Sequence, residues 1–181
     1  TGASGEGDHS GRYETGCHME EGMRMEENLS KCLRETFSLP DEVDAKMYSP
    51  LTLAFVGDGV YELVNRTVLV SQANAPVNKL NRKSSSLAKA STQAEMILLI
   101  MEELTEEEKA VFKRGRNAKS YTMAKNATMH DYRYATGFEA LMGYLYLKGE
   151  FGRLMALICL GQEKLAEKQK AEQQHCRNEG T

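Results

Sequence analysis

The chain of 181 residues lacks several features that would place it in a specialised class of protein. It has no run of about 18 apolar residues, which excludes a conventional transmembrane helix. No basic segment followed by an apolar one opens the sequence, so no secretory signal is visible. The four cysteines are scattered without a CxxC pair, as is typical of free thiols in a reducing compartment. With 41% hydrophobic and 27% charged residues, the sequence predicts a cytoplasmic protein with one globular domain and room for tails.

Charge is distributed unevenly along the chain, although the formal net charge is only −3. Residues 1–50 carry 11 acidic and 5 basic side chains, whereas residues 51–160 carry 11 acidic and 14 basic ones. Residues 66–89 hold five lysines or arginines and no acid, and residues 112–133 hold six with a single acid. Two such blocks favour a polyanionic partner, while a solvated surface is the commoner explanation of any one block.

Hydrophobic periodicity predicts an all-α fold, because no strand-period segment of any length is present. The Ser49-Pro50 pair is typical of a helix start, with serine as the N-cap and proline in the first turn. The helix that it opens is expected to end near Val70. Further helices are predicted at residues 77–104, 105–115, 132–148 and 150–160, with an exposed loop at residues 116–131.

Two of these predicted helices each carry a lone carboxylate in an apolar run. Asp58 lies within residues 51–64 and Glu139 within residues 135–147, and neither has a lysine or arginine within one helical turn. A buried, uncompensated carboxylate costs several kcal/mol, so a divalent metal shared by the two is the economical candidate. The simpler alternative is local hydrogen bonding of Asp58 and partial exposure of Glu139. Gly57 and Gly59 in the first helix indicate close approach of another backbone, or a site that needs room.

These two segments resemble a known family of nucleases. Residues 55–62 are similar to the signature helix of ribonuclease III catalytic domains, and residues 138–146 resemble the second carboxylate helix of that family. More specifically, the chain resembles the Mini-ribonuclease III branch, which lacks a double-stranded-RNA-binding domain. Further segments fall in order with that branch at residues 78–80, 93–94, 114–120 and 132–134. The resemblance covers about residues 47–160.

The resemblance implies the all-α ribonuclease III endonuclease-domain fold, working as a homodimer. It implies that Asp58 and Glu139 are catalytic and hold Mg²⁺, with Mn²⁺ as a substitute. In the chemistry of this family, a metal-activated water cleaves one strand of duplex RNA and leaves a 5′-phosphate and a 3′-hydroxyl. The resemblance also implies precursor large-subunit (23S) ribosomal RNA as the substrate, with a ribosomal protein presenting it.

The sequence departs from the long ribonuclease III enzymes at two acidic positions. Those enzymes have a glutamate where this chain has Ala54, and an aspartate where it has Thr136. The Mini branch is similarly depleted, so the departure agrees with that branch. With only two carboxylates, we expect one tightly held metal ion. A non-catalytic relative that binds RNA or assists ribosome assembly is the alternative, and a helical protein-interaction domain is a third hypothesis.

The basic blocks acquire a role from the same resemblance. An A-form duplex is recognised mainly through phosphates and 2′-hydroxyl groups, largely by shape. The side chains expected to contact it are Lys79, Arg82, Lys83, Arg114, Arg116, Lys119 and Lys125. A solubilising surface charge explains each of them about equally well.

Three parts are expected along the chain. Residues 1–46 form an acidic leader that is partly disordered or foreign to the native protein. Residues 47–160 form the ribonuclease III-like catalytic domain, and residues 161–181 form a polar tail that adds little packing.

Overall fold

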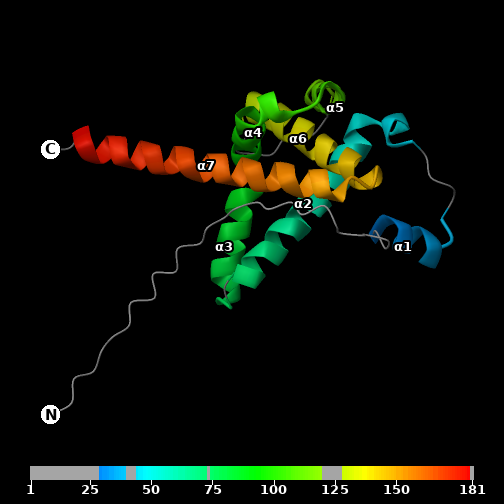
Figure 1. Cartoon of the computed structure of the whole chain (residues 1–181), viewed down its shortest axis with the longest axis horizontal. Helices are drawn as coiled ribbons and strands as arrows, with labels where there is room; N and C mark the ends of the chain where they lie inside the picture. Colours follow the sequence, from blue (N-terminus) through cyan, green and yellow to red (C-terminus); the bar gives the residue numbers. More distant parts are fainter. Residues whose placement is uncertain (1–28, 40–43, 73, 120–127, 180–181) are drawn as a thin grey trace, which may run out of the picture.

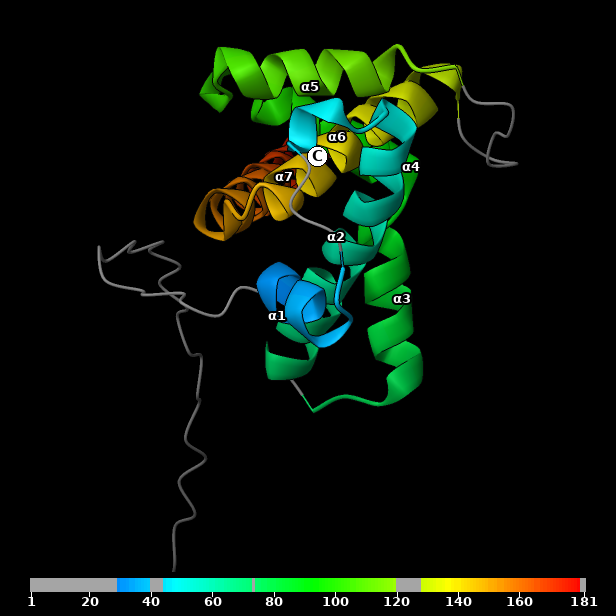
Figure 2. The same cartoon turned by 90° about the vertical axis from the view of Figure 1, so that its right-hand side faces the viewer.

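The computed structural model describes residues 29–39, 44–72, 74–119 and 128–179, and every regular element in these ranges is helical. This confirms the predicted all-α fold. The elements are α1 (Leu29–Thr36), η1 (Ala45–Met47), α2 (Pro50–Gln72), α3 (Val77–Leu87), α4 (Ala90–Leu99), η2 (Met101–Glu103), α5 (Glu106–Arg116), α6 (Met129–Leu147) and α7 (Phe151–Glu179). Figure 1 shows α1 lying apart from the packed helices, and Figure 2 shows α3 running beside the second half of α2.

Local capping fixes the beginning of the first long helix. Ser49 Oγ accepts a hydrogen bond from the Thr52 backbone N–H at 3.1 Å, and its carbonyl accepts from the Leu53 N–H at 3.0 Å. Proline occupies the first helical position, where a missing N–H costs nothing. The predicted start of α2 is therefore confirmed, and the helix ends at Gln72, two residues later than expected.

Capping also fixes α5 and α6. Thr105 and Glu108 form the predicted capping box, each side chain accepting from the other's backbone N–H at 3.2 and 2.8 Å. Helix α6 begins three residues earlier than expected, because Thr128 Oγ1 accepts from the Asp131 N–H at 3.0 Å. It ends just before Gly149, whose φ of 79° suits a helix C-terminus.

The predicted single helix over residues 77–104 is wrong. The chain forms α3 and α4 instead, separated where Lys89 takes an extended conformation with ψ of 138°. Hydroxyl groups satisfy carbonyls that the break frees: Tyr61 Oη donates to the Leu87 oxygen at 3.2 Å, and Thr92 Oγ1 donates to the Ser86 oxygen at 2.9 Å. The hydrophobic period continues across the break, which is why the sequence pattern does not reveal it.

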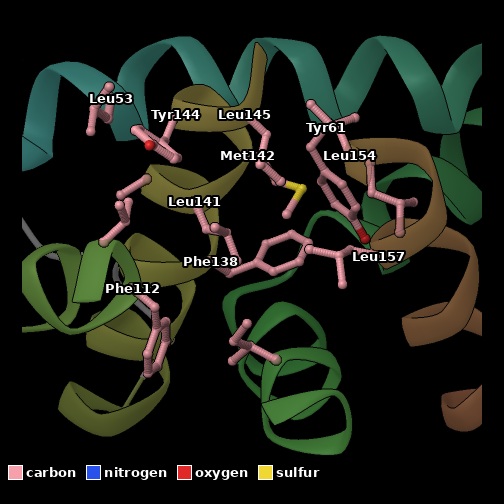
Figure 3. Close-up of a cluster of buried hydrophobic side chains, with 14 of the residues drawn as sticks. Leu53, Tyr61, Phe112, Phe138, Leu141, Met142, Tyr144, Leu145, Leu154 and Leu157 are labelled. Carbon is pink, nitrogen blue, oxygen red and sulfur yellow. The ribbon is translucent and has the colours of Figure 1, made fainter. Parts of the chain in front are cut away.

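Helix α6 forms the centre of the core and packs against α2, α4, α5 and α7. Figure 3 shows Phe138, Leu141, Met142 and Leu145 of α6 among side chains of the surrounding helices. Tyr61 from α2 meets Phe138 in an edge-to-face pair, with ring centroids 5.1 Å apart. A helix that is apolar nearly all round belongs in the interior, and α6 is accordingly buried along most of its length.

Helix α7 is longer than the predicted helix over residues 150–160. Leu154 and Leu157 are fully buried in its first half, and Leu165 is buried beyond residue 160. Its C-terminal half projects from the helical body (Figure 1). Within the described ranges, no helix is both long and apolar enough to cross a membrane.

Candidate active site

The site begins with a contact between the backbones of α2 and α6. A Cβ atom at Gly57 would overlap the carbonyl oxygen of Glu139 and lie 2.6 Å from the Gly143 nitrogen. A Cβ at Gly143 would overlap the carbonyl oxygen of Leu53. Only glycine at both positions lets the helices touch in this way. The prediction that Gly57 marks close approach of another backbone is confirmed.

Gly59 has a different environment from Gly57. A Cβ atom added there would meet no atom within 4 Å among the described residues. Of the two alternatives expected for Gly59, close approach of another backbone is therefore wrong, and space around the site is the one that agrees with the structure. Gly59 instead leaves open space beside Asp58 on the exposed side of α2.

The α2–α6 contact brings Asp58 and Glu139 together, although 80 residues separate them in the sequence. Burial, and after it the nearby Asp58 charge, raises the pKa of the Glu139 carboxyl to about 8. The pKa of Asp58 is also raised, first by partial loss of hydration and then by the charge of Glu62, one turn along α2. The charge of Glu62 therefore affects Asp58, and the charge of Asp58 affects Glu139. The Glu62 carboxylate is itself paired with the Arg66 guanidinium at 2.7 Å.

Gln93 of α4 belongs to the same site, a role that sequence reasoning missed. Its side chain is 1% exposed, and within the part of the chain that the structure describes neither amide atom has a hydrogen-bond partner of ordinary geometry. The amide nevertheless lies beside the Glu139 carboxyl and lowers the pKa of that group, in opposition to the effect of burial. The sequence could have indicated this role, because Gln93 is a polar residue among the apolar positions of a core helix.

The oxygen donors suit a hard divalent cation such as Mg²⁺, which takes few protein ligands and keeps several waters. A cation between Asp58 and Glu139 would offset the repulsion and the lost hydration that raise both pKa values. Among the described residues, no group of three or more acids, histidines or cysteines is placed to hold a metal. A metal here would therefore be held by two carboxylates, with water or substrate oxygens filling the other positions.

The two departures from the long enzymes are visible in the structure. Ala54 is buried, with 6% of its surface exposed. Thr136 is equally buried, and its hydroxyl donates to the Tyr132 carbonyl oxygen at 2.9 Å. Neither residue offers a free oxygen to a cation, so the site is a two-carboxylate site.

The basic residues predicted to contact RNA fall into two groups. Lys79, Arg82 and Lys83 are exposed on α3, and Lys119 is exposed just after α5. Lys125 lies outside the described residues. Their contact with RNA stays a prediction.

Arg114 and Arg116 on α5 have protein partners. The Arg114 guanidinium donates to the carbonyl oxygens of Lys46 at 3.3 Å and Tyr48 at 2.9 Å, which ties η1 to α5. The Arg116 guanidinium lies over the rings of Phe112 and Tyr134, 5.9 and 5.7 Å from their centroids. Both therefore support the fold, whether or not they also meet RNA.

The sequence that forms this site matches the model of a known protein family. The Ribonuclease III domain matches residues 51–150, which include α2, α6 and both carboxylates. The chain belongs to the ribonuclease III family. Membership agrees with the central α6 and with acids on two touching helices.

Relatives place the chain in the short branch of the ribonuclease III family. It is 47% identical over 143 residues to a Mini-ribonuclease 3 of Thermoanaerobacter sp. (strain X514), covering 79% of this chain and 100% of the relative. It is 50% identical over 118 residues to a Mini-ribonuclease 3 of Clostridium tetani, covering 65% and 78%. The crystal structure of a Fusobacterium nucleatum protein superposes with a TM-score of 0.59 at 30% identity, covering 64% of this chain and 88% of that one.

These relatives confirm the resemblance to Mini-ribonuclease III. They support an endoribonuclease, a hydrolase that cuts within RNA, over the two non-catalytic hypotheses. Ribonuclease III enzymes generally depend on divalent metals, which agrees with the donor chemistry of Asp58 and Glu139.

Proposed function

We propose that this ribonuclease III family member cleaves double-stranded RNA at a centre formed by Asp58 and Glu139. The observation that carries the proposal is the glycine-mediated contact of α2 and α6, which brings the two carboxylates together. Asp58 is exposed while Glu139 is half-buried, so the pair lies at the edge of the core where a large substrate has access.

Asp58 and Glu139 would hold Mg²⁺, or Mn²⁺ in its place. When bound, the metal would neutralise phosphate charge and activate a water for hydrolysis. The protein's own contribution is to position the carboxylates and to manage a proton. Because the pKa of Glu139 is about 8, its carboxyl is mostly protonated at neutral pH and must release that proton to bind a cation.

The proposal is tested by incubating long duplex RNA and Mg²⁺ with the parent protein, Asp58→Asn and Glu139→Gln. A matched control is Glu102→Gln, which removes an exposed acid of η2. Parent and control should release fragments with 5′-phosphate ends, and the two site variants should bind the duplex without cutting it. If the parent also binds without cutting, a non-catalytic RNA-binding protein is the better description.

We further propose a homodimer, because α2 exposes apolar side chains on one stripe. Phe55 is 83% exposed, Leu51 is 39% exposed and Leu63 is 56% exposed, at spacings of four and eight residues along the helix. A regularly spaced apolar stripe beside a catalytic site is suited to an interface. A second copy covering this stripe would place two sites on one assembly.

The exposed basic side chains of α3 are proposed to contact the duplex. Lys79, Arg82 and Lys83 carry three positive charges on one short helix that has no acid. Phosphate contacts of this kind give binding that weakens steeply with salt. The RNA-contact role of Arg114, Arg116, Lys119 and Lys125 is retained in the same proposal, the two arginines having the structural contacts described above.

The substrate in the cell is proposed to be precursor 23S ribosomal RNA, trimmed at its ends and presented by a ribosomal protein. Membership of the Mini-ribonuclease III branch supports this choice. We expect a precursor stem to be cleaved faster than an unrelated duplex of equal length. Adding large-subunit ribosomal proteins should increase this difference further.

A further inference from the structure

Gln93 is an anomaly in the core of the molecule. It lies on α4 between apolar neighbours, with Ala94 2% exposed and Met96 fully buried, and it is itself 1% exposed. Both of its amide atoms are buried without a hydrogen-bond partner among the described residues. Buried polar groups are nearly always paired, so an orphaned amide needs an explanation.

The position of the amide suggests that explanation. Helix α6 packs against α2 on one side and α4 on another. Glu139 on α6 therefore interacts with Asp58 from α2 and with Gln93 from α4. The orphaned amide faces the one carboxylate of the site that is held within the core.

A second buried amide shows how the fold treats such a group elsewhere. Asn65, which is 2% exposed, accepts a hydrogen bond at its Oδ1 from Gln162 Nε2 at 2.7 Å, while its Nδ2 has no hydrogen-bond partner among the described residues. That pair joins α2 to α7, two turns along α2 from Asp58. At Gln93 neither amide atom has such a partner among the described residues, so an amide pair within the fold does not account for its position.

We propose that Gln93 is a positioning residue, whose side-chain N–H donates to the Glu139 carboxylate and holds it in the orientation that binds the divalent cation. The amide nitrogen then has a partner in the metal-bound state. Groups that orient a metal ligand from behind in this way typically change metal affinity by 10- to 100-fold. The inference rests on the proposed function of Asp58 and Glu139.

The test is Mn²⁺ binding to the full chain, measured by calorimetry on the parent and on Gln93→Met. Methionine keeps the volume and removes the amide. Because the amide is unsatisfied without metal, the variant should be as stable as the parent, or more stable, in metal-free buffer. Its Mn²⁺ affinity should fall about 10-fold, and Mn²⁺ should raise its melting temperature less than that of the parent.

Gln162→Met is the matched control, because it removes an amide that has a structural partner. It should lower the metal-free melting temperature and leave the Mn²⁺ affinity unchanged. The opposite signs of the two variants separate a positioning role from a packing role. A Gln93→Met protein that is less stable but binds Mn²⁺ like the parent would overturn the inference.

If Gln93→Met does not fold, Gln93→Asn is measured instead, since it keeps an amide but withdraws it by one methylene. Weaker Mn²⁺ binding by that variant supports the inference, and parental affinity overturns it. If the parent itself binds no Mn²⁺, the proposed metal site and this inference both fail, whereas parental binding with an unaffected Gln93 variant removes the inference alone.

Discussion

Replacing Glu139 by glutamine is expected to stabilise the metal-free protein, and to do so increasingly as the pH rises from 5 to 8. The pKa of this carboxyl is about 8 in the folded protein, against an ordinary value of 4.5. Between these values the folded protein keeps a proton that the unfolded chain releases. The stability of the parent should therefore fall as the pH rises through this window and level off above pH 8.

The expected size follows from the two pKa values. Each unit of difference corresponds to about 1.4 kcal/mol, and about 2.6 of the 3.5 units act between pH 5 and pH 8, so the parent should lose at most about 3.6 kcal/mol over this range. For a chain of this length, that corresponds to a fall of about 7–14 °C in melting temperature. Glutamine has nearly the same shape and does not titrate, so the variant should lack this loss.

Urea unfolding of parent and variant at pH 5, 6, 7 and 8, with a chelator and at equal protein concentration, measures the difference. Glu102→Gln is the control for removing one exposed carboxylate, and its curves should follow the parent. Adding Mg²⁺ at pH 8 should restore stability to the parent and not to Glu139→Gln. If the parent and Glu139→Gln respond to pH in parallel, the argument from burial is refuted.

Other predictions concern the helix contact, the interface and RNA binding. Gly57→Ala should destabilise the protein by about 3 kcal/mol or more in thermal unfolding, since its Cβ would overlap α6, whereas Gly59→Ala should be neutral or stabilise slightly. Phe55→Arg should convert a dimer to a monomer in light-scattering chromatography, and a dimer that persists contradicts the proposed interface. Replacing Arg82 and Lys83 together by alanine should weaken duplex binding and flatten its salt dependence without changing melting temperature; unaltered binding would exclude this surface.

Much of the fold could be predicted because its signals are local. The capping side chains of Ser49, Thr105 and Glu108 lie within three or four residues of the backbone groups that they cap. A short stretch of sequence is therefore enough to predict where α2 and α5 begin. The pairing of Asp58 with Glu139 is not local. It could be inferred from an energetic argument about lone carboxylates and from resemblance, and the glycine of α2 hinted at the contact that achieves it.

The features that sequence reasoning missed depend on tertiary contacts. The break between α3 and α4 is stabilised in part by the hydroxyl of Tyr61, which lies 26 residues before the carbonyl that it reaches. Arg114 finds its backbone partners 66 and 68 residues away, so its charge alone suggested a role at the surface. Gln93 was missed because its significance is the absence of a partner, which only the packed core reveals.

Unfavourable features gather at the crossing of α2 and α6. The touching backbones require Gly57 in a helix interior, the half-buried Glu139 loses hydration of its charge, and Gln93 has no hydrogen-bond partner in the described ranges. Each lowers the stability of the metal-free protein, and the proposed cation would offset the burial of the Glu139 charge. Ala54 gives the reduced acid set a physical reason: it is 6% exposed, so an acid there would add another carboxylate that loses its hydration. A site with two acids would therefore destabilise the metal-free protein less than a site with four. A bound metal would then take more of its ligands from water and from the phosphate of the RNA.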